Sequence, residues 1–217
     1  MNAHGGRIRL VLAAVIVGMF APGVVAAQAW NYPAFQPPTI TSREFNFALA
    51  DGGDFGTALV AQWREGVGVR TQLGLELGFA DPDGGGDTFL LVGGNFAYQM
   101  TRASADMPLD VLLAAGLNFA SGDPVDFIRI PIGVVLGHRF PLEGQLAITP
   151  YAHPKLQLDF CGDCGEESEF GIGFDIGANF EFSPALAMRL ALVFGGSDYF
   201  DDESAFGLSL AWHPGRR

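Results

Sequence analysis

Two cysteines have a spacing that could carry chemistry. Cys161-Gly-Asp-Cys164 is a Cys-x-x-Cys motif, which occurs in redox-active sites and as one half of a zinc site. The other half of a zinc site is missing, and we expect no helix here that would activate a thiol. Because exported proteins meet oxidising conditions, we expect a local disulfide between Cys161 and Cys164 that stiffens a loop.

Acidic residues could bind hard cations in residues 81 to 87 and 198 to 203. Carboxylates supply the oxygen ligands that Ca²⁺ and Mg²⁺ prefer. The spacing does not match an EF-hand loop, so we interpret both stretches as solvated acidic loops, with weak binding of divalent cations as the alternative. The candidate ligands are Asp81, Asp83, Asp87, Asp198, Asp201 and Asp202. We expect no cofactor.

The histidines are not arranged as a catalytic centre would need them. Hydrolysis would require a serine or histidine placed beside a carboxylate. His138 stands on an apolar strand face without a serine beside it. We expect His153 to point inward next to Lys155, where packing explains it better than catalysis. The sequence therefore predicts no enzymatic activity.

β-strands must position these residues, because apolar residues alternate with small or polar ones, with a period of two, from residue 41 onward. In residues 170–182, FGIGFDIGANFEF, every second residue is apolar and those between are small or polar. A strand projects successive side chains to opposite faces, so such a segment has one apolar and one polar face. Ten segments show this period: 41–50, 57–65, 69–80, 88–100, 108–119, 126–140, 145–160, 170–182, 185–195 and 204–212.

The aromatic residues on the apolar faces fall into two rows near opposite strand ends. One row contains Phe79, Phe119, Phe160, Phe170, Phe194 and Phe206, and the other contains Trp63, Tyr98, Phe140, Phe182 and Trp212. Two aromatic belts around an aliphatic band are typical of transmembrane barrels. We therefore predict an all-β fold, an antiparallel up-and-down transmembrane barrel over residues 41–212. An even count of ten strands is expected, with eight as the alternative.

The N-terminus predicts export. Arg7 and Arg9 precede a short apolar run, and Ala27-Gln28-Ala29 fits signal peptidase, with Val25-Ala26-Ala27 as a second option. We expect a cleaved signal peptide over residues 1–29 and passage through the Sec pathway. Cleavage leaves ten of the 12 basic residues against 24 acidic ones, a net charge of about −14, which argues against nucleic-acid binding. Residues 30–40, rich in proline and aromatics, are interpreted as a tether, with a plug of the barrel mouth as the alternative. Residues 213–217 form a short tail.

With these features the sequence resembles the superfamily of small outer-membrane β-barrels, the opacity, OmpA-like and OmpW-like kind. The resemblance rests on the export signal, the alternating strands and the final strand, 206–212. That strand looks like the C-terminal signal read by the barrel-assembly machinery, with Gly207, Leu210 and Trp212 in the expected spacing, although residues 213–217 follow it and no polar residue immediately precedes Gly207. The resemblance implies the outer membrane of a diderm bacterium, contact with its lipid and insertion by that machinery. It implies no catalytic residues.

In such a barrel the polar faces line the lumen. We expect Glu76, Arg129, Glu181 and Arg189 there, among other charged residues of both signs. If Phe160 lies opposite Phe170, the same register places Lys155 opposite Asp175, and we predict an ion pair between them. The inward glycines fill nothing and would leave space. Both a plugged lumen and a narrow polar pore therefore stay open.

We expect a structural or surface role, or a narrow polar pore. One alternative is uptake of small hydrophobic solutes through a lateral opening. It would need an apolar upper lumen, against which the inward Lys155, Asp175 and Arg129 argue. Another is adhesion through the acidic loops. A soluble lipocalin-like barrel with its apolar face inward is the rival fold, but it would not explain two aromatic belts or a single lysine in the whole chain.

Overall fold

The computed structural model describes residues 34 to 215, except residues 53–55, 83–87, 123–124, 162–167 and 198–199. No helix in this part of the chain is long and apolar enough to cross a membrane.

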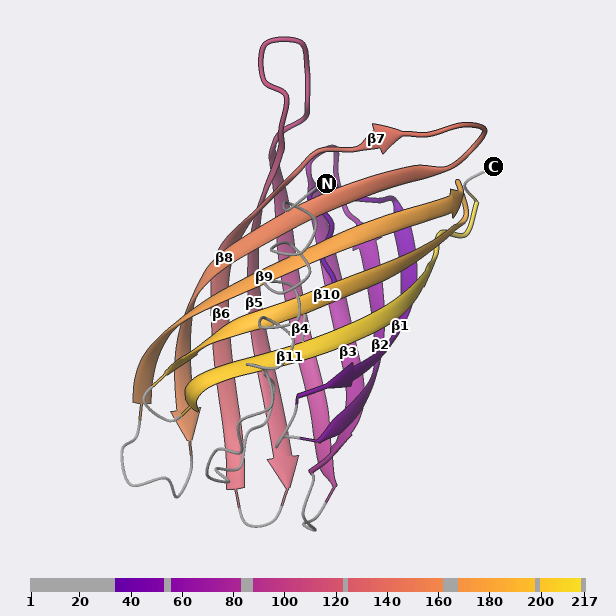
Figure 1. The fold of residues 1–217 in the computed structure, drawn as a ribbon. Helices are drawn as coiled ribbons and strands as arrows, with labels where there is room; N and C mark the ends of the chain where they lie inside the picture. The colour runs from indigo at the N-terminus through magenta and orange to yellow at the C-terminus, as the bar shows by residue number, and fades with distance from the viewer. Residues whose placement is uncertain are drawn as a thin grey trace, which may run out of the picture.

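The described residues form one antiparallel sheet, which closes on itself because β1 pairs with β11 (Figure 1). The strands are β1 (Arg43–Asp51), β2 (Thr57–Gly66), β3 (Thr71–Asp81), β4 (Phe89–Thr101), β5 (Asp110–Gly122), β6 (Val125–Gly137), β7 (Phe140–Pro141), β8 (Ala147–Cys161), β9 (Ser168–Ser183), β10 (Leu186–Ser197) and β11 (Phe200–Trp212). The two-residue β7 pairs only with the start of β8, whereas β6 pairs with β8 directly. Ten strands therefore make the wall, and the predicted ten-stranded antiparallel barrel is confirmed.

The barrel has two distinct ends. The connections β1–β2, β3–β4, β5–β6, β8–β9 and β10–β11 lie at one end, which we call the loop end. The start of β1, the end of β11 and the remaining connections lie at the other, which we call the terminal end. The terminal end is uppermost in Figure 1, where the β4–β5 hairpin stands above the rim.

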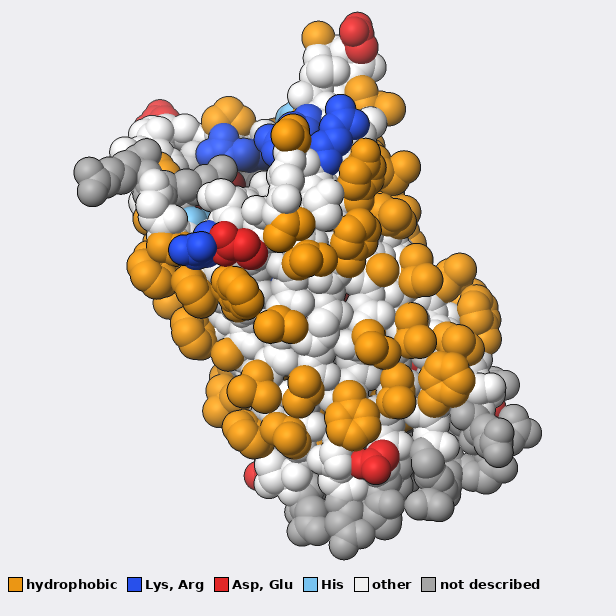
Figure 2. All heavy atoms as spheres, turned by 180° about the vertical axis from the view of Figure 1, so that it is seen from behind, with side chains coloured by type: hydrophobic (Ala, Val, Ile, Leu, Met, Phe, Trp, Pro, Cys, Tyr) orange, Lys and Arg blue, Asp and Glu red, His pale blue; other side chains and the backbone are white. Residues whose placement is uncertain are grey.

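The apolar face of each strand points outward. In β9, Phe170 is 63% exposed and Ile172 is 65% exposed, while Asp175 on the opposite face is buried. Large apolar side chains cover the outer wall of β1 to β6 in Figure 2. A soluble lipocalin-like barrel would bury this face, so the rival fold does not hold for this structure.

The eleven predicted belt aromatics lie on the outer face, and all but the partly buried Phe194 are at least 36% exposed. One row lies toward the terminal end and the other toward the loop end, as their strand positions require. The distance between the rows is set by strand length, because each residue advances a strand by about 3.3 Å.

Inside the barrel the side chains form layers. An apolar layer toward the loop end contains Val60, Phe89, Leu91 and Phe127 together with several alanines. The buried Arg129–Asp159 pair lies beside this layer, and most other buried charged residues lie in the middle and at the terminal end, where a second apolar cluster contains Leu112, Val135 and Tyr151. Of the tether expected over residues 30–40, residues 30–33 lie outside the described residues. Residues 34–40, and Thr41 after them, enter the lumen instead, and Phe35 is buried within the apolar layer. This part of the chain follows the plug alternative, because barrel side chains bind its backbone.

Candidate functional site in the barrel lumen

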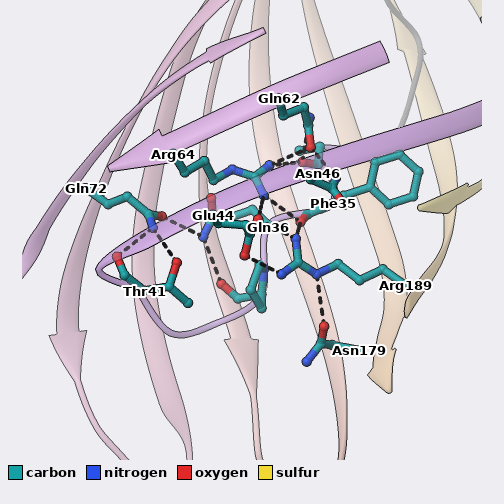
Figure 3. A network of polar contacts seen from close by, with 12 residues as sticks. Phe35, Gln36, Thr41, Glu44, Asn46, Gln62, Arg64, Gln72, Asn179 and Arg189 are labelled. Atoms are coloured by element: carbon teal, nitrogen blue, oxygen red, sulfur yellow. Dashed lines mark hydrogen bonds and ion pairs between the residues drawn. The ribbon is translucent and has the colours of Figure 1, made fainter. Parts of the chain in front are cut away.

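A buried carboxylate between two arginines forms the centre of the lumen at the terminal end (Figure 3). Glu44 on β1 accepts hydrogen bonds from Arg64 on β2, at 2.6 Å, and from Arg189 on β10, at 2.6 and 2.7 Å. All three side chains are about 1% exposed. Arg189 reaches Glu44 across β11, where the inward residues Ser209 and Ala211 are small. The closed sheet thus brings together residues 145 positions apart in the sequence.

The same two arginines hold the segment of residues 34 to 41. Arg64 donates to the carbonyl oxygens of Ala34, at 2.7 Å, and of Phe35, at 3.2 Å, and Arg189 donates to that of Phe35 at 3.0 Å. Phe35 has a φ of 48°, in the left-handed region that bulky residues rarely adopt. The two hydrogen bonds that its carbonyl accepts from buried guanidinium groups stabilise this conformation.

Two glutamines fix the rest of the segment. Gln99 accepts from the backbone N–H of Ile40 at 3.1 Å and donates to the carbonyl of Pro38 at 2.9 Å. Gln72 donates to the backbone and side-chain oxygens of Thr41, both at 3.1 Å. Polar groups of a buried segment need partners, and the barrel wall supplies them here. Residues 34 to 41 are therefore an integral part of the lumen.

The ion pair expected between Lys155 and Asp175 is present, with Nζ 2.6 Å from Oδ1 and both groups buried. The register behind the expectation is wrong by two residues, because Lys155 lies opposite Gly173 and His153 lies opposite Asp175. Lys155 reaches Asp175 along the diagonal, and a side chain at Gly173 would meet Lys155 Cε at 2.7 Å. His153 Nδ1 also approaches Asp175, at 3.3 Å.

Arg129, expected in the lumen, forms a second buried ion pair there. Its Nε and Nη2 donate to the two carboxylate oxygens of Asp159, both at 2.8 Å. The two residues are directly opposite on β6 and β8. The alternation predicted the inward direction of Arg129 but did not identify Asp159 as its partner. The register is the same along the whole hairpin, from Phe140 opposite Ile148 to Arg129 opposite Asp159, so the pair follows once the position of the turn is known.

Glu76 on β3 has no basic partner within ion-pair distance among the described residues. It accepts from Gln62 at 3.0 Å and from Asn95 at 2.7 Å. It lines a cavity of about 60 Å³, together with Arg129, Lys155 and Gln157. A cavity of this size has room for a few water molecules. Such waters could bond the Oε1 of Gln157, which has no protein partner.

The inward glycines do not leave the space that was expected. A Cβ atom at Gly177 would overlap the ring of Tyr151, and one at Gly133 would meet His153 Nε2 at 2.7 Å. The expectation of space was wrong because large side chains on neighbouring strands lean over these glycines. Because glycine has no side chain at these positions, the larger neighbouring side chains can pack over it and fill the lumen.

The remaining predicted site residues lie at the two ends. Glu181 binds Arg139 at the terminal rim, at 2.8 Å. Cys161 ends β8 and is disulfide-bonded, while Cys164 lies outside the described residues. Asp81 is exposed at the end of β3. Asp83, Asp87 and Asp198, and the side chains of Asp201 and Asp202, are outside the description. Where the chain is described, no group of three or more His, Cys, Asp or Glu residues could hold a metal ion.

Solved structures resemble this arrangement in fold. A bacterial polysaccharide outer-membrane secretin matches with a TM-score of 0.50 and 9% identity, over 81% of this chain and 66% of that chain, just under two thirds of its length. LpxR from Salmonella typhimurium matches with a TM-score of 0.48 and 12% identity, over 78% and 99% of the two chains. KdgM porin matches at 0.38 and 8%, over 78% and 98%.

The chain has the fold of outer-membrane β-barrels. At these identities the likeness extends to the fold alone. No family model and no curated protein matches the sequence, so the comparisons do not assign the chain to the opacity, OmpA-like or OmpW-like kind.

Proposed function

We propose that this protein is an integral barrel of the outer membrane of a diderm bacterium, exported through the Sec pathway and inserted by the barrel-assembly machinery. The outward apolar band between two aromatic belts supports this location, since water would not stabilise so large an exposed apolar surface. A closed sheet leaves no unpaired edge in lipid. The proposal includes no catalytic step and no cofactor.

Within that membrane we propose a structural or surface role with a closed lumen, in preference to a narrow polar pore. This choice rests on the hydrogen bonds that Arg64 and Arg189 donate to the backbone carbonyls of Ala34 and Phe35, which keep this segment inside the lumen. The apolar layer toward the loop end supports it, because a polar pore would need polar groups along its whole length.

Swelling of proteoliposomes in a small sugar tests the closed lumen. Vesicles containing the mature chain, which begins at Trp30, are expected to swell no faster in arabinose than empty vesicles. Vesicles containing an open porin serve as the positive control. Arabinose entry above the rate of empty vesicles would favour the narrow pore.

Uptake of small hydrophobic solutes is the second candidate, because part of the lumen is apolar after all. Val60, Phe89, Leu91 and Phe127 line the loop side, next to the Arg129–Asp159 pair, while most other inward charges lie in the middle and at the terminal end. A diazirine-bearing alkylbenzene tests this candidate by photolabelling in membranes. Labels on Phe89 or Phe127 would support uptake, and labels confined to outward residues would support the closed barrel.

Adhesion or weak divalent-cation binding through the loop end is a third candidate. Residues 51–57, 81–88, 121–126, 161–169 and 197–203 contain 15 acidic residues and no lysine or arginine. Titration of the detergent-solubilised protein with CaCl₂ in a calorimeter tests cation binding. Absence of heat at millimolar Ca²⁺ would remove it.

A further inference from the structure

We propose that the outer wall of β2 to β5 binds an anionic phospholipid, with the phosphate at Arg70 and Arg102 and an acyl chain in a groove above Gly94. This inference rests on the membrane location proposed above. It concerns the outer surface, and it is independent of whether the lumen is open.

The groove follows from a glycine on the outward face. Gly94 on β4 lies between Leu75 on β3 and Leu117 on β5, which are its direct partners in the two ladders. A Cβ atom at Gly94 would meet nothing closer than a backbone oxygen at 3.9 Å. The large side chains around this position, with Trp63 and Phe96 among them, therefore enclose a groove of about 640 Å³. In a membrane such a groove is filled by hydrocarbon, and its volume and apolar lining suit an acyl chain.

The groove leads to the rim at the terminal end, where two arginines lie above it. Val67 in the β2–β3 turn and Leu73 on β3 line the groove, and Arg70 belongs to the same turn. The carbonyl of Arg70 accepts from the backbone N–H of Gln99 on β4 at 2.8 Å. Arg102 follows the last residue of β4. The two arginines therefore lie next to the terminal ends of two adjacent strands, β3 and β4, just beyond the aromatic belt.

These arginines differ from the other described arginines at this rim, which pair with a carboxylate. Arg43 pairs with Glu65 at 2.7 Å and Arg139 pairs with Glu181 at 2.8 Å. Arg70 and Arg102 are exposed, and neither has an ion-pair partner among the described residues. Basic side chains gather at this end of the outer wall, above the apolar band, in Figure 2.

A phospholipid fits this combination better than a soluble anion would. Guanidinium groups recognise phosphate oxygens, and arginines next to interfacial aromatics lie at headgroup depth. A basic residue near the surface favours an anionic over a zwitterionic lipid by about fivefold. Because the apolar groove begins directly below, one molecule can occupy both parts.

Quenching of Trp63 tests the site, because Trp63 lines the groove. With Trp30→Phe and Trp212→Phe as background, Trp63 is the only tryptophan left in the chain. The folded protein is placed in vesicles that contain phosphatidylglycerol or phosphatidylcholine with brominated acyl chains. Because each of the two arginines contributes about fivefold, half-maximal quenching is expected at about 25-fold less brominated phosphatidylglycerol than phosphatidylcholine. The double variant R70A/R102A is expected to abolish this preference.

Two further variants keep the inference falsifiable. Arg139→Ala removes a rim arginine away from the groove and is expected to keep the preference. Gly94→Leu fills the groove and is expected to weaken quenching by both lipids. Equal quenching by both lipids in the parent, or loss of the preference in Arg139→Ala, would overturn the lipid site. Failure of the parent to float with vesicles would instead count against the membrane location.

Discussion

Replacement of Glu44 by glutamine tests the buried network most sharply. Glu44 is the only acidic residue within ion-pair distance of Arg64 and Arg189 among the described residues, and all three are about 1% exposed. Glutamine keeps the shape but leaves two buried cations without a counter-charge. Breaking a buried pair in this way costs about 3–5 kcal/mol. We expect the free energy of unfolding of Glu44→Gln to fall by that amount.

The assay is urea unfolding of the mature chain in lipid vesicles, followed by tryptophan fluorescence and extrapolated linearly to zero urea. Glu65→Gln is the matched control, because it also removes the carboxylate partner of an arginine on a neighbouring strand. The Arg43–Glu65 pair is exposed to solvent, with Arg43 at 53%, so little or no change is expected. Equal effects of the two substitutions would refute the reasoning that the lumen network is desolvated and stabilising.

Two other substitutions test the lumen packing and the outer wall. Gly177→Ala is expected to lower the free energy of unfolding by about 1–3 kcal/mol, because its methyl group would overlap Tyr151. Gly68→Ala, with nothing within 4 Å, should be close to neutral in the same urea titration. Ile176→Arg, midway between the belts on β9, is expected to cost about 2–4 kcal/mol in vesicles, and Ser168→Arg at the strand end roughly 0–1 kcal/mol. Similar costs at both depths would count against a membrane around this band.

The barrel wall was predictable because a period of two is a local property of the chain. Each of the ten predicted segments overlaps one long strand, and the belt aromatics fall on the outer face. The segment 126–140 differs, since β6 ends at Gly137 and β7 begins at Phe140. That break depends on how the chain turns at the rim, which alternation does not encode.

Contacts inside the lumen were predictable only in part. Alternation told which residues face inward, but the partner of each depends on the register between strands. The assumed register of β8 and β9 was wrong by two residues, and the Lys155–Asp175 pair forms only because a lysine is long enough to reach along the diagonal. The Glu44 cluster joins three strands that meet through closure of the sheet.

The position of residues 34 to 41 could not be predicted from their own sequence. Prolines and aromatics without alternation suit a tether as well as a plug. What decides between them is a set of distant side chains, Arg64, Gln72, Gln99 and Arg189, whose donors need partners inside the barrel. The inward direction of these four side chains was predictable. Without a segment in the lumen their N–H donors would lack partners, and that is the signal that would have favoured the plug.

Planar-bilayer recording of the purified mature protein tests most directly whether this membrane barrel is closed. Because the lumen is filled by ion pairs, an apolar layer and residues 34 to 41, we predict no conductance steps at high protein load, while heat-modifiable migration shows that the barrel is folded. Stable, uniform conductance steps from the folded protein would contradict a closed lumen.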